Sequence, residues 1–165
     1  HFMAVDGVHE AVIQNEWVSL KMNDVKNVEV NREFYFLNTG SPHYVAEVKG
    51  LTHYNVFENG KNIRYNDRFK NEGTNVNFIE TEGGKLFVRT YERGVENETF
   101  SCGTGVTAAA LAASLKGLAG AKDYCDIKTL GGELRVRFKR HPDNSFTDIW
   151  LEGPAVFVFE GEVEV

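Results

Sequence analysis

The residues that could do chemistry gather between Glu92 and Leu115. Glu92-Arg93-Gly94 comes first, Ser101-Cys102-Gly103-Thr104-Gly105 follows, and an alanine-rich run completes the stretch. If that run is a helix, Cys102 lies at its N-terminus, where free backbone N–H groups and the positive end of the helix dipole favour a thiolate. We therefore expect the pKa of Cys102 to be lowered, and we expect the nearby glycine amides to accept a carboxylate.

Each cysteine also has a purely structural interpretation, because a lone cysteine is more often a small buried hydrophobe than a catalyst. For Cys125, in the strand-like stretch 123–127, packing is the interpretation that we adopt. For Cys102, the glycine-rich context leaves packing and catalysis both open.

A second candidate group is His43, which ends the loop segment Thr39-Gly40-Ser41-Pro42-His43. A histidine after proline has a restricted backbone and can serve as an acid–base group, although a surface-loop histidine is the alternative. Glu92 and Arg93 could be an ordinary surface ion pair, and Asn75 could be a turn residue. No role is predicted for the other histidines, which stand in polar, turn-like contexts: His9, His53 and His141.

Composition and charge argue against several classes of protein. A net charge of −6 gives no indication of a nucleic acid or an anionic membrane as partner, and no apolar stretch is long enough to span a bilayer. Two cysteines without metal-ligand spacing predict neither a disulfide scaffold nor a metal site. With 42% hydrophobic residues among 165, the chain can bury the core of one domain or of two small ones. No basic and apolar leader is visible, so we expect a cytoplasmic location.

Most of the chain predicts short strands, because apolar and polar residues alternate or β-branched and aromatic residues lie between turn signals. Glycine pairs at Gly83-Gly84 and Gly131-Gly132 predict two hairpins. The predicted strands are 16–22, 33–37, 44–48, 75–80, 85–91, 126–130, 133–139, 147–151 and 155–159.

Two segments predict helices. Residues 55–68 are polar with spaced apolar side chains, which suits a surface helix, although Asn59-Gly60 disfavours it. Residues 105–116 carry alanine and leucine on nearly every face, so this helix should be buried, with Gly117 ending it. The sequence therefore predicts an α+β fold in which a curved sheet is wrapped around one central helix.

Taken together, the motifs resemble those of the diaminopimelate epimerase family. Four of them occur in that family's order and rough spacing: Thr39–His43, Gly73–Phe78, Glu92–Gly94 and Ser101–Gly105. The ending Glu152–Glu162 is also similar to the family's tail. The resemblance runs across nearly the whole chain, and four motifs in order are far more specific than any single one.

The resemblance implies an enzyme that inverts one α-carbon of LL-diaminopimelate to give the meso form, in the pathway to lysine and peptidoglycan. Family members need no pyridoxal phosphate or other cofactor, and they consist of two similar halves, each a barrel-like sheet around a helix. The site lies between the halves, and each half contributes one cysteine. One thiolate removes the α-proton while the opposite thiol delivers a proton to the other face.

Carried over residue by residue, the resemblance assigns acid–base chemistry to three side chains of this sequence. Cys102 resembles the cysteine of the second half. Glu92 resembles the carboxylate that assists it, and His43 resembles the histidine that assists the opposing cysteine.

The resemblance also assigns substrate contacts, with diaminopimelate as the small-molecule partner. The chain departs from the family at Ser41, where asparagine is usual; a hydroxyl is shorter than an amide, so one contact is lost or replaced by water. The expected substrate-binding residues are Ser41, Asn75, Glu92, Arg93, Gly103 and Thr104.

The family's first half has no counterpart in these residues. Its Cys-Gly-Asn-Gly run does not occur, and Cys125 does not match it because no glycine follows. Residues 1–22 resemble strands that finish the missing N-terminal half, 23–155 the C-terminal half, and 156–165 a strand returning to the first half. We therefore expect the missing half as a partner and an inactive isolated chain, while homodimer formation stays open.

Four alternative functions are considered beside the epimerase. Proline racemases share the Cys-Gly-Thr-Gly motif, but they typically have Asp-Arg-Ser-Pro before it, where this chain has Glu98-Thr99-Phe100-Ser101. A phenazine-type isomerase of the same fold is disfavoured by the cysteine at the helix N-terminus. A non-enzymatic domain that binds an amino acid or anion, and a cysteine hydrolase pairing Cys102 with His43, are the remaining alternatives.

Overall fold

The computed structural model describes residues 1–4, 7–118 and 123–163 of the chain, and one large sheet dominates them. The fold is α+β, mostly sheet with two α-helices among the described residues. In spatial order the sheet contains β3 (Ala11–Gln14), β4 (Trp17–Lys21), β13 (Phe146–Pro154), β12 (Gly132–Arg140), β11 (Tyr124–Thr129), β9 (Lys85–Glu92), β8 (Asn75–Glu82), β7 (Pro42–Glu47), β6 (Tyr35–Asn38) and β5 (Val28–Val30), with β10 (Asn97–Thr99) paired to β9 beside this path.

The sheet is open, because β3 and β5 form its two edges and do not pair with each other. The barrel-like form that the resemblance implied is therefore corrected to an open sheet. Most neighbouring strands are antiparallel, but β7 pairs with β8 and β9 pairs with β11 in parallel. Parallel neighbours require a crossover connection. The first crossover contains η1 (Leu51–His53) and α1 (Val56–Arg64), and the second contains α2 (Gly103–Lys116).

Helix α2 is buried because nearly every side chain on it is apolar or small. Residues 105–114 are all buried, and the helix packs against β6, β7, β8, β9, β11, β12 and β13. It begins two residues earlier than predicted, at Gly103, with Cys102 as the extended N-cap residue. Gly117 ends the helix as predicted, in a left-handed conformation with φ of 82°.

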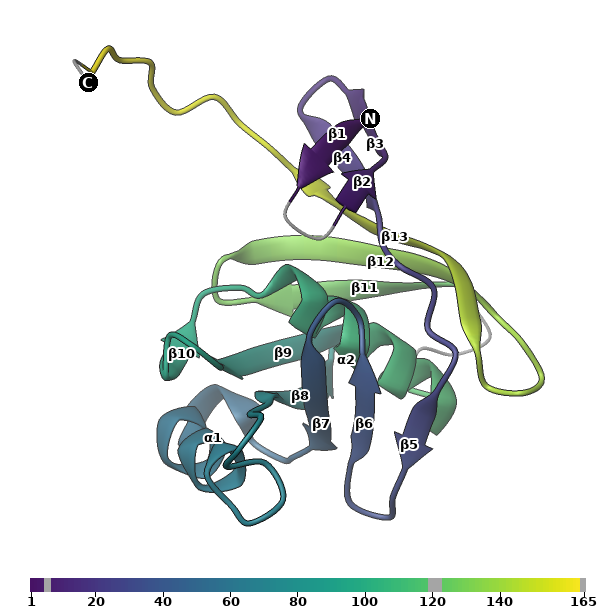
Figure 1. The fold of residues 1–165 in the computed structure, drawn as a ribbon, viewed down its shortest axis with the longest axis vertical. Coiled ribbons are helices and arrows are strands. Elements are labelled where there is room, and N and C mark those ends of the chain that lie inside the picture. Colours follow the sequence, from purple (N-terminus) through teal and green to yellow (C-terminus); the bar gives the residue numbers. More distant parts are fainter. Residues whose placement is uncertain (5–6, 119–122, 164–165) are drawn as a thin grey trace.

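The predicted strands agree with the structure except at the C-terminus. The hairpins at Gly83-Gly84 and Gly131-Gly132 are confirmed as the β8–β9 and β11–β12 connections. The prediction of a strand over 155–159 is wrong: residues 155–163 form no strand, although the backbone N–H of Ala155 still donates to the Glu16 carbonyl at 2.7 Å. The tail and the separate hairpin of β1 (Phe2–Ala4) and β2 (Gly7–His9) lie on the side of the molecule opposite α1 (Figure 1).

The surface helix predicted over 55–68 is shorter than expected, since α1 ends at Arg64. Asn55 caps its start, accepting a hydrogen bond from the backbone N–H of Glu58 at 3.2 Å. The presence of Gly60 inside α1 is explained by close packing. A Cβ at this position would overlap Cβ of Tyr91 and lie 2.7 Å from its Cγ.

Replacing Gly60 with alanine is expected to destabilise the protein, although alanine is the better helix former. The gain in helix propensity is about 1 kcal/mol, whereas overpacking a filled core costs about 1–3 kcal/mol. We expect a net loss of about 1 kcal/mol in the free energy of unfolding, measured by urea denaturation. The control is Asn62→Ala on the exposed face of α1, which should be neutral or slightly stabilising. A stabilised Gly60→Ala variant would show that the packing against Tyr91 is loose.

Candidate active site

The N-terminus of α2 opens into a pocket of about 460 Å³. Segments distant in sequence form it: β2, the end of β4, the loop after β6, the end of β9, the start of α2, and β13. Five residues predicted from sequence lie in this lining: Ser41, Glu92, Cys102, Gly103 and Thr104. The remaining lining residues are His9, Leu20, Met22, Asn23, Thr39, Gly40, Ser101 and Leu151.

Cys102 is buried, with only 8% of its surface exposed, and its Sγ lies 3.5 Å from Oγ1 of Thr104. Burial raises the pKa of the Cys102 thiol, and the negative charge of Glu92 adds to this effect. Hydrogen bonds from the Thr104 hydroxyl and from the amides of Gly105 and Thr104 act in the opposite direction. The predicted lowering of this pKa is therefore wrong, because desolvation of the thiolate outweighs the helix N-terminus.

Because Gly105 has no side chain, the start of α2 can approach the sheet closely. A Cβ at this position would lie 2.5 Å from Oδ1 of Asn77 and 3.2 Å from Sγ of Cys102. The second glycine of the Cys-Gly-Thr-Gly motif is thus needed for packing, as well as for leaving the backbone amides open to a ligand. It allows the first turn of α2 to lie directly against β8.

Glu92 is the last residue of β9, and its side chain is half-buried. Its carboxylate accepts a hydrogen bond of 2.9 Å from Oγ1 of Thr99 on β10. Strand β10 pairs with β9 so that Thr99 lies opposite Thr90, which brings the two segments side by side. The pairing fixes the Glu92 carboxylate in the wall of the pocket that contains Cys102.

His43 lies on β7 beneath the pocket and has no exposed surface. Its Nε2 is 3.0 Å from Oγ of Ser41, and its Nδ1 is 3.1 Å from Nδ2 of Asn77. Burial lowers the pKa of His43 to about 3, and the charge of Arg93 contributes in the same direction. The imidazole is consequently neutral at ordinary pH, and it reaches the pocket through Ser41.

Asn75 and Arg93 do not line the pocket. Asn75 lies beside His43 in the β7–β8 register, donates from Nδ2 to Ser41 Oγ at 3.0 Å, and accepts at Oδ1 from the backbone N–H of Arg93 at 2.9 Å. The exposed side chain of Arg93 donates to the carbonyl of Glu72 at 2.9 Å. In this chain Asn75 therefore supports the loop of Ser41, and Arg93 lies outside the pocket wall.

Asn77, for which no role was predicted from the sequence, is fully buried at the centre of the polar contacts. Its Nδ2 donates to the Tyr44 carbonyl at 3.0 Å as well as contacting His43, and its Oδ1 accepts from Thr90 Oγ1 at 3.0 Å. The signal in the sequence was its spacing: Asn75 and Asn77 are two apart, so they share one face of a strand. Two amides on a face that should be apolar indicate a buried polar network.

Thr39 and His9 are two further pocket residues without a predicted role. Thr39 is buried and donates from Oγ1 to the backbone carbonyl of Thr104 at 2.8 Å, which ties the β6–β7 loop to the first turn of α2. His9 comes from the N-terminal hairpin, where its ring stacks on Phe2 with centroids 5.5 Å apart. No local pattern could place a residue of that hairpin near residue 102.

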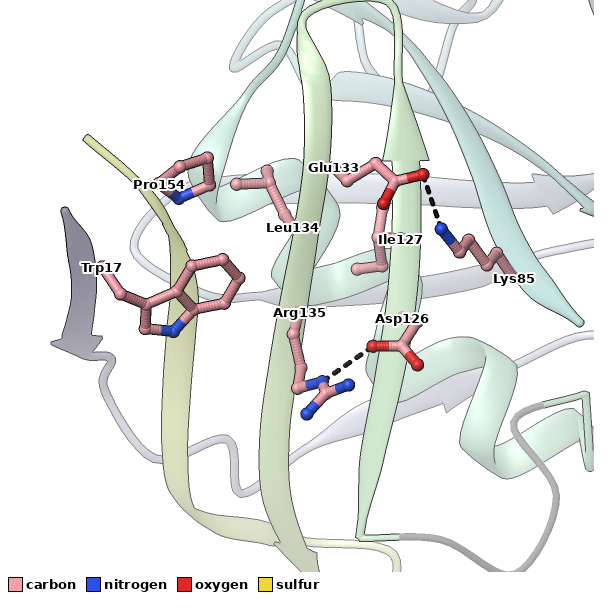
Figure 2. A pocket seen from close by; sticks show the side chains of 8 residues that line it. All are labelled: Trp17, Lys85, Asp126, Ile127, Glu133, Leu134, Arg135 and Pro154. Carbon is pink, nitrogen blue, oxygen red and sulfur yellow. Dashed lines mark hydrogen bonds and ion pairs between the residues drawn. The ribbon is translucent and has the colours of Figure 1, made fainter. Parts of the chain in front are cut away.

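A second hollow of about 480 Å³ lies over β4, β9, β11, β12 and β13 (Figure 2). Its charged side chains pair with each other: Lys85 with Glu133 at 2.5 Å, and Arg135 with Asp126 at 2.7 Å. Trp17 and Pro154 form its opposite wall (Figure 2). Because the charges compensate one another within the wall, the pocket at Cys102 is the better candidate for chemistry.

No group of three or more His, Cys, Asp or Glu side chains in the described part is arranged to hold a metal ion. No helix within 1–4, 7–118 and 123–163 has the length and hydrophobicity to cross a membrane.

Comparison with known proteins identifies similar sequences over most of the chain. The family model described as diaminopimelate epimerase matches residues 35–158. The diaminopimelate epimerase of Flavobacterium psychrophilum is 44% identical over 161 residues, covering 96% of this chain and 62% of the relative. That of Aquifex aeolicus is 40% identical over 129 residues, covering 78% of this chain and 45% of the relative. The chain thus spans about half of the length of the curated relatives that it matches.

Solved structures with the same fold are more distant in sequence. A hydroxyproline epimerase from Agrobacterium vitis has a TM-score of 0.64 at 15% identity, covering 92% of this chain and 55% of that one. A probable proline racemase from Agrobacterium radiobacter has the same TM-score at 16% identity, covering 94% and 56%. At these sequence identities, the two similarities show a shared fold only.

Proposed function

The chain belongs to the diaminopimelate epimerase family, and we propose that it supplies one half of the active site of an enzyme that converts LL-diaminopimelate to meso-diaminopimelate. The observation that carries the proposal is the position of Cys102. Its thiol lies at the N-terminus of a buried helix and in one pocket with Glu92. Such a pocket can hold a carboxylate at the helix amides while the thiol exchanges a proton with the α-carbon.

In the proposed mechanism Cys102 acts as an acid in one direction and as a base in the other. With its pKa raised by burial, the thiol keeps its proton at neutral pH and can deliver it to the α-carbon. The base that removes the opposite α-proton is then a thiolate of the N-terminal half. Inversion requires both groups, because a proton must leave one face and arrive at the other. Glu92 assists by keeping the Cys102 proton on sulfur until the substrate's charges arrive.

We further propose that the substrate's α-carboxylate binds the amides of Gly103 and Thr104, and that Ser41 and Glu92, which line the pocket, contact its other polar groups. Asn75 and Arg93 lie outside this pocket, so their contact with the distal end of the substrate stays a prediction from the family resemblance. The arginine fork suits a distal carboxylate, since it can form two parallel hydrogen bonds. His43 stays assigned to the opposing cysteine as a prediction from the family resemblance. The open sheet and α2 would then form the C-terminal half of the enzyme, wrapped around its helix in the complete protein.

The apolar surface at the ends of the chain supports the proposal of a missing N-terminal half. Val8, Ile13 and Phe157 are 67%, 71% and 80% exposed. Large exposed apolar surfaces of this kind mark interaction sites. We propose that residues 1–22 and 156–165 complete the N-terminal half, with 23–155 as the C-terminal half. A cytoplasmic location, the absence of a cofactor and homodimer formation stay predictions.

The half-site is tested by comparing this chain with a chimera in which the N-terminal part of the Flavobacterium psychrophilum relative precedes it. Each protein is mixed with LL-diaminopimelate, and meso product is measured by chiral chromatography. We expect turnover by the chimera and none by the isolated chain. Turnover by the isolated chain at about 1 per second or faster would contradict the half-site.

The same chimera separates the alternative functions. An epimerase exchanges the substrate's α-proton with deuterium from the solvent, whereas a cysteine hydrolase accumulates an acyl-enzyme detectable by mass. If the chimera inverts proline and leaves diaminopimelate unchanged, the racemase alternative is correct. If it binds diaminopimelate without exchange, the chain is a binding domain.

A further inference from the structure

A chain of hydrogen bonds leads from His43 to the sulfur of Cys102 through two hydroxyl groups. Nε2 of His43 is 3.0 Å from Oγ of Ser41, and that oxygen is 3.2 Å from Oγ1 of Thr104. Oγ1 of Thr104 is in turn 3.5 Å from Sγ of Cys102. Either atom could donate in each of the last two contacts, so the direction of these hydrogen bonds decides their effect on the thiol.

The direction at the His43 end is fixed by Asn77. Nδ2 of Asn77 is the donor end of its amide, because it contacts the Tyr44 carbonyl, which can only accept. The same Nδ2 therefore donates to Nδ1 of His43. A neutral imidazole that accepts at Nδ1 carries its proton on Nε2, so His43 donates to Ser41.

The direction at Ser41 is fixed by Asn75. Oδ1 of Asn75 accepts from the backbone N–H of Arg93, and its Nδ2 donates to the Pro42 carbonyl and to Oγ of Ser41. The Ser41 oxygen thus accepts two hydrogen bonds, one from Asn75 and one from His43. A serine hydroxyl has a single proton, and here it can only be donated onward to Thr104.

We propose that Ser41 and Thr104 form a one-way hydroxyl relay that donates a hydrogen bond to the sulfur of Cys102 and favours its thiolate. Thr104 accepts from Ser41, so its own proton is directed at Sγ. In terms of the epimerase function proposed above, on which its catalytic meaning rests, the relay makes Ser41 and Thr104 positioning residues for Cys102. Ser41 is therefore the residue that passes the hydrogen bond from His43 to Thr104.

Other groups around Cys102 also affect the pKa of its thiol. Glu92 on β9 opposes it, since its negative charge disfavours a thiolate, while the amides of Gly105 and Thr104 on α2 support it. His9 on β2 lines the same pocket, and Arg93 acts on His43 by its charge. Burial keeps the thiol pKa above its ordinary value overall, so loss of the relay should raise it further.

The test is the rate of alkylation of Cys102 by iodoacetamide as a function of pH, followed by peptide mapping so that Cys125 is counted separately. Thr104→Val removes the hydroxyl donor and keeps the branched shape. We expect the pH midpoint of the Cys102 alkylation profile to rise by roughly one unit, so that alkylation at a pH below the midpoint is about tenfold slower than in the parent. Ser41→Ala should shift the midpoint in the same direction. Thr104→Ser keeps the hydroxyl and should reproduce the parent profile.

Glu92→Gln is the matched control, because removal of its charge should lower the midpoint. The relay is overturned if Thr104→Val and Thr104→Ser give the same profile. It is also overturned if Ser41→Ala keeps the parent midpoint while Thr104→Val shifts it, since Thr104 would then act alone. Thermal unfolding of each variant identifies any that fails to fold. Alkylation needs no substrate, so this result is independent of whether the chimera epimerises diaminopimelate.

Discussion

Replacing Cys102 with alanine in the chimera that contains both halves is expected to reduce kcat for diaminopimelate epimerisation by about a thousandfold or more. One of the two acid–base groups is then absent, and a positioned acid–base group contributes about 10²–10⁴-fold. Binding of diaminopimelate should change little, because in the proposed mechanism the thiol acts on the transferred proton while the amides of Gly103 and Thr104 hold the carboxylate. The measurement is kcat by chiral chromatography together with Kd by calorimetry.

Cys125→Ala is the matched control for that experiment. Cys125 is buried in β11, as predicted, among the apolar residues that pack against α2. Its replacement should lower the free energy of unfolding and leave kcat within about twofold of the parent, since substitutions that only alter packing act on stability. If Cys102→Ala instead keeps its full rate and loses only stability, the thiol at the helix N-terminus is a packing residue.

Replacing Asn77 with leucine is expected to cause the largest loss of stability in the site. Three partners would lose their hydrogen bonds to the amide: Nδ1 of His43, the carbonyl of Tyr44 and the hydroxyl of Thr90. A buried group left without a partner costs about 1–3 kcal/mol. We expect a loss of roughly 2–4 kcal/mol in the free energy of unfolding, below the sum of three because neighbouring groups couple.

The measurement is urea denaturation of Asn77→Leu beside the control Asn62→Leu, whose side chain is exposed on α1. The control should change the free energy of unfolding by less than about 0.5 kcal/mol, as surface substitutions do. Equal midpoints for the two variants would mean that the buried amide is not needed for stability. The pH profile of Cys102 alkylation in Asn77→Leu is a second readout. The variant removes the hydrogen bond from Asn77 to Nδ1 of His43, which places the His43 proton on the nitrogen that faces Ser41.

Much of the fold could be predicted from local patterns. Alternation of apolar and polar residues located the central strands, and the glycine pairs located two of the hairpins. Alanine on every face of residues 105–116 predicted a buried helix, which the structure confirms. These predictions succeeded because period, propensity and turn residues act over a few neighbouring positions. The open form of the sheet was missed, since closure depends on whether the two edge strands meet.

Short segments with weak local signals were predicted least well. The strands β5 and β10 have three residues each and exist because β6 and β9 offer them backbone partners. The tail after Pro154 shows the reverse: its sequence favours a strand, but among the described residues no strand pairs with it beyond the contact of Ala155 with Glu16. In both cases a neighbouring backbone decides the outcome, and a local pattern contains no information about that neighbour.

By itself the sequence determined the residue types of the site, their order and the family to which the chain belongs. Only the tertiary structure decided what those residues do to one another. It buried Cys102 deeply enough to raise the pKa of its thiol, and it made His43 neutral. Both effects come chiefly from desolvation, to which the charge of Glu92 adds at Cys102 and the charge of Arg93 adds at His43. Each depends on side chains that the parallel pairing of β7 with β8 and the packing of α2 bring together from positions far apart in the chain.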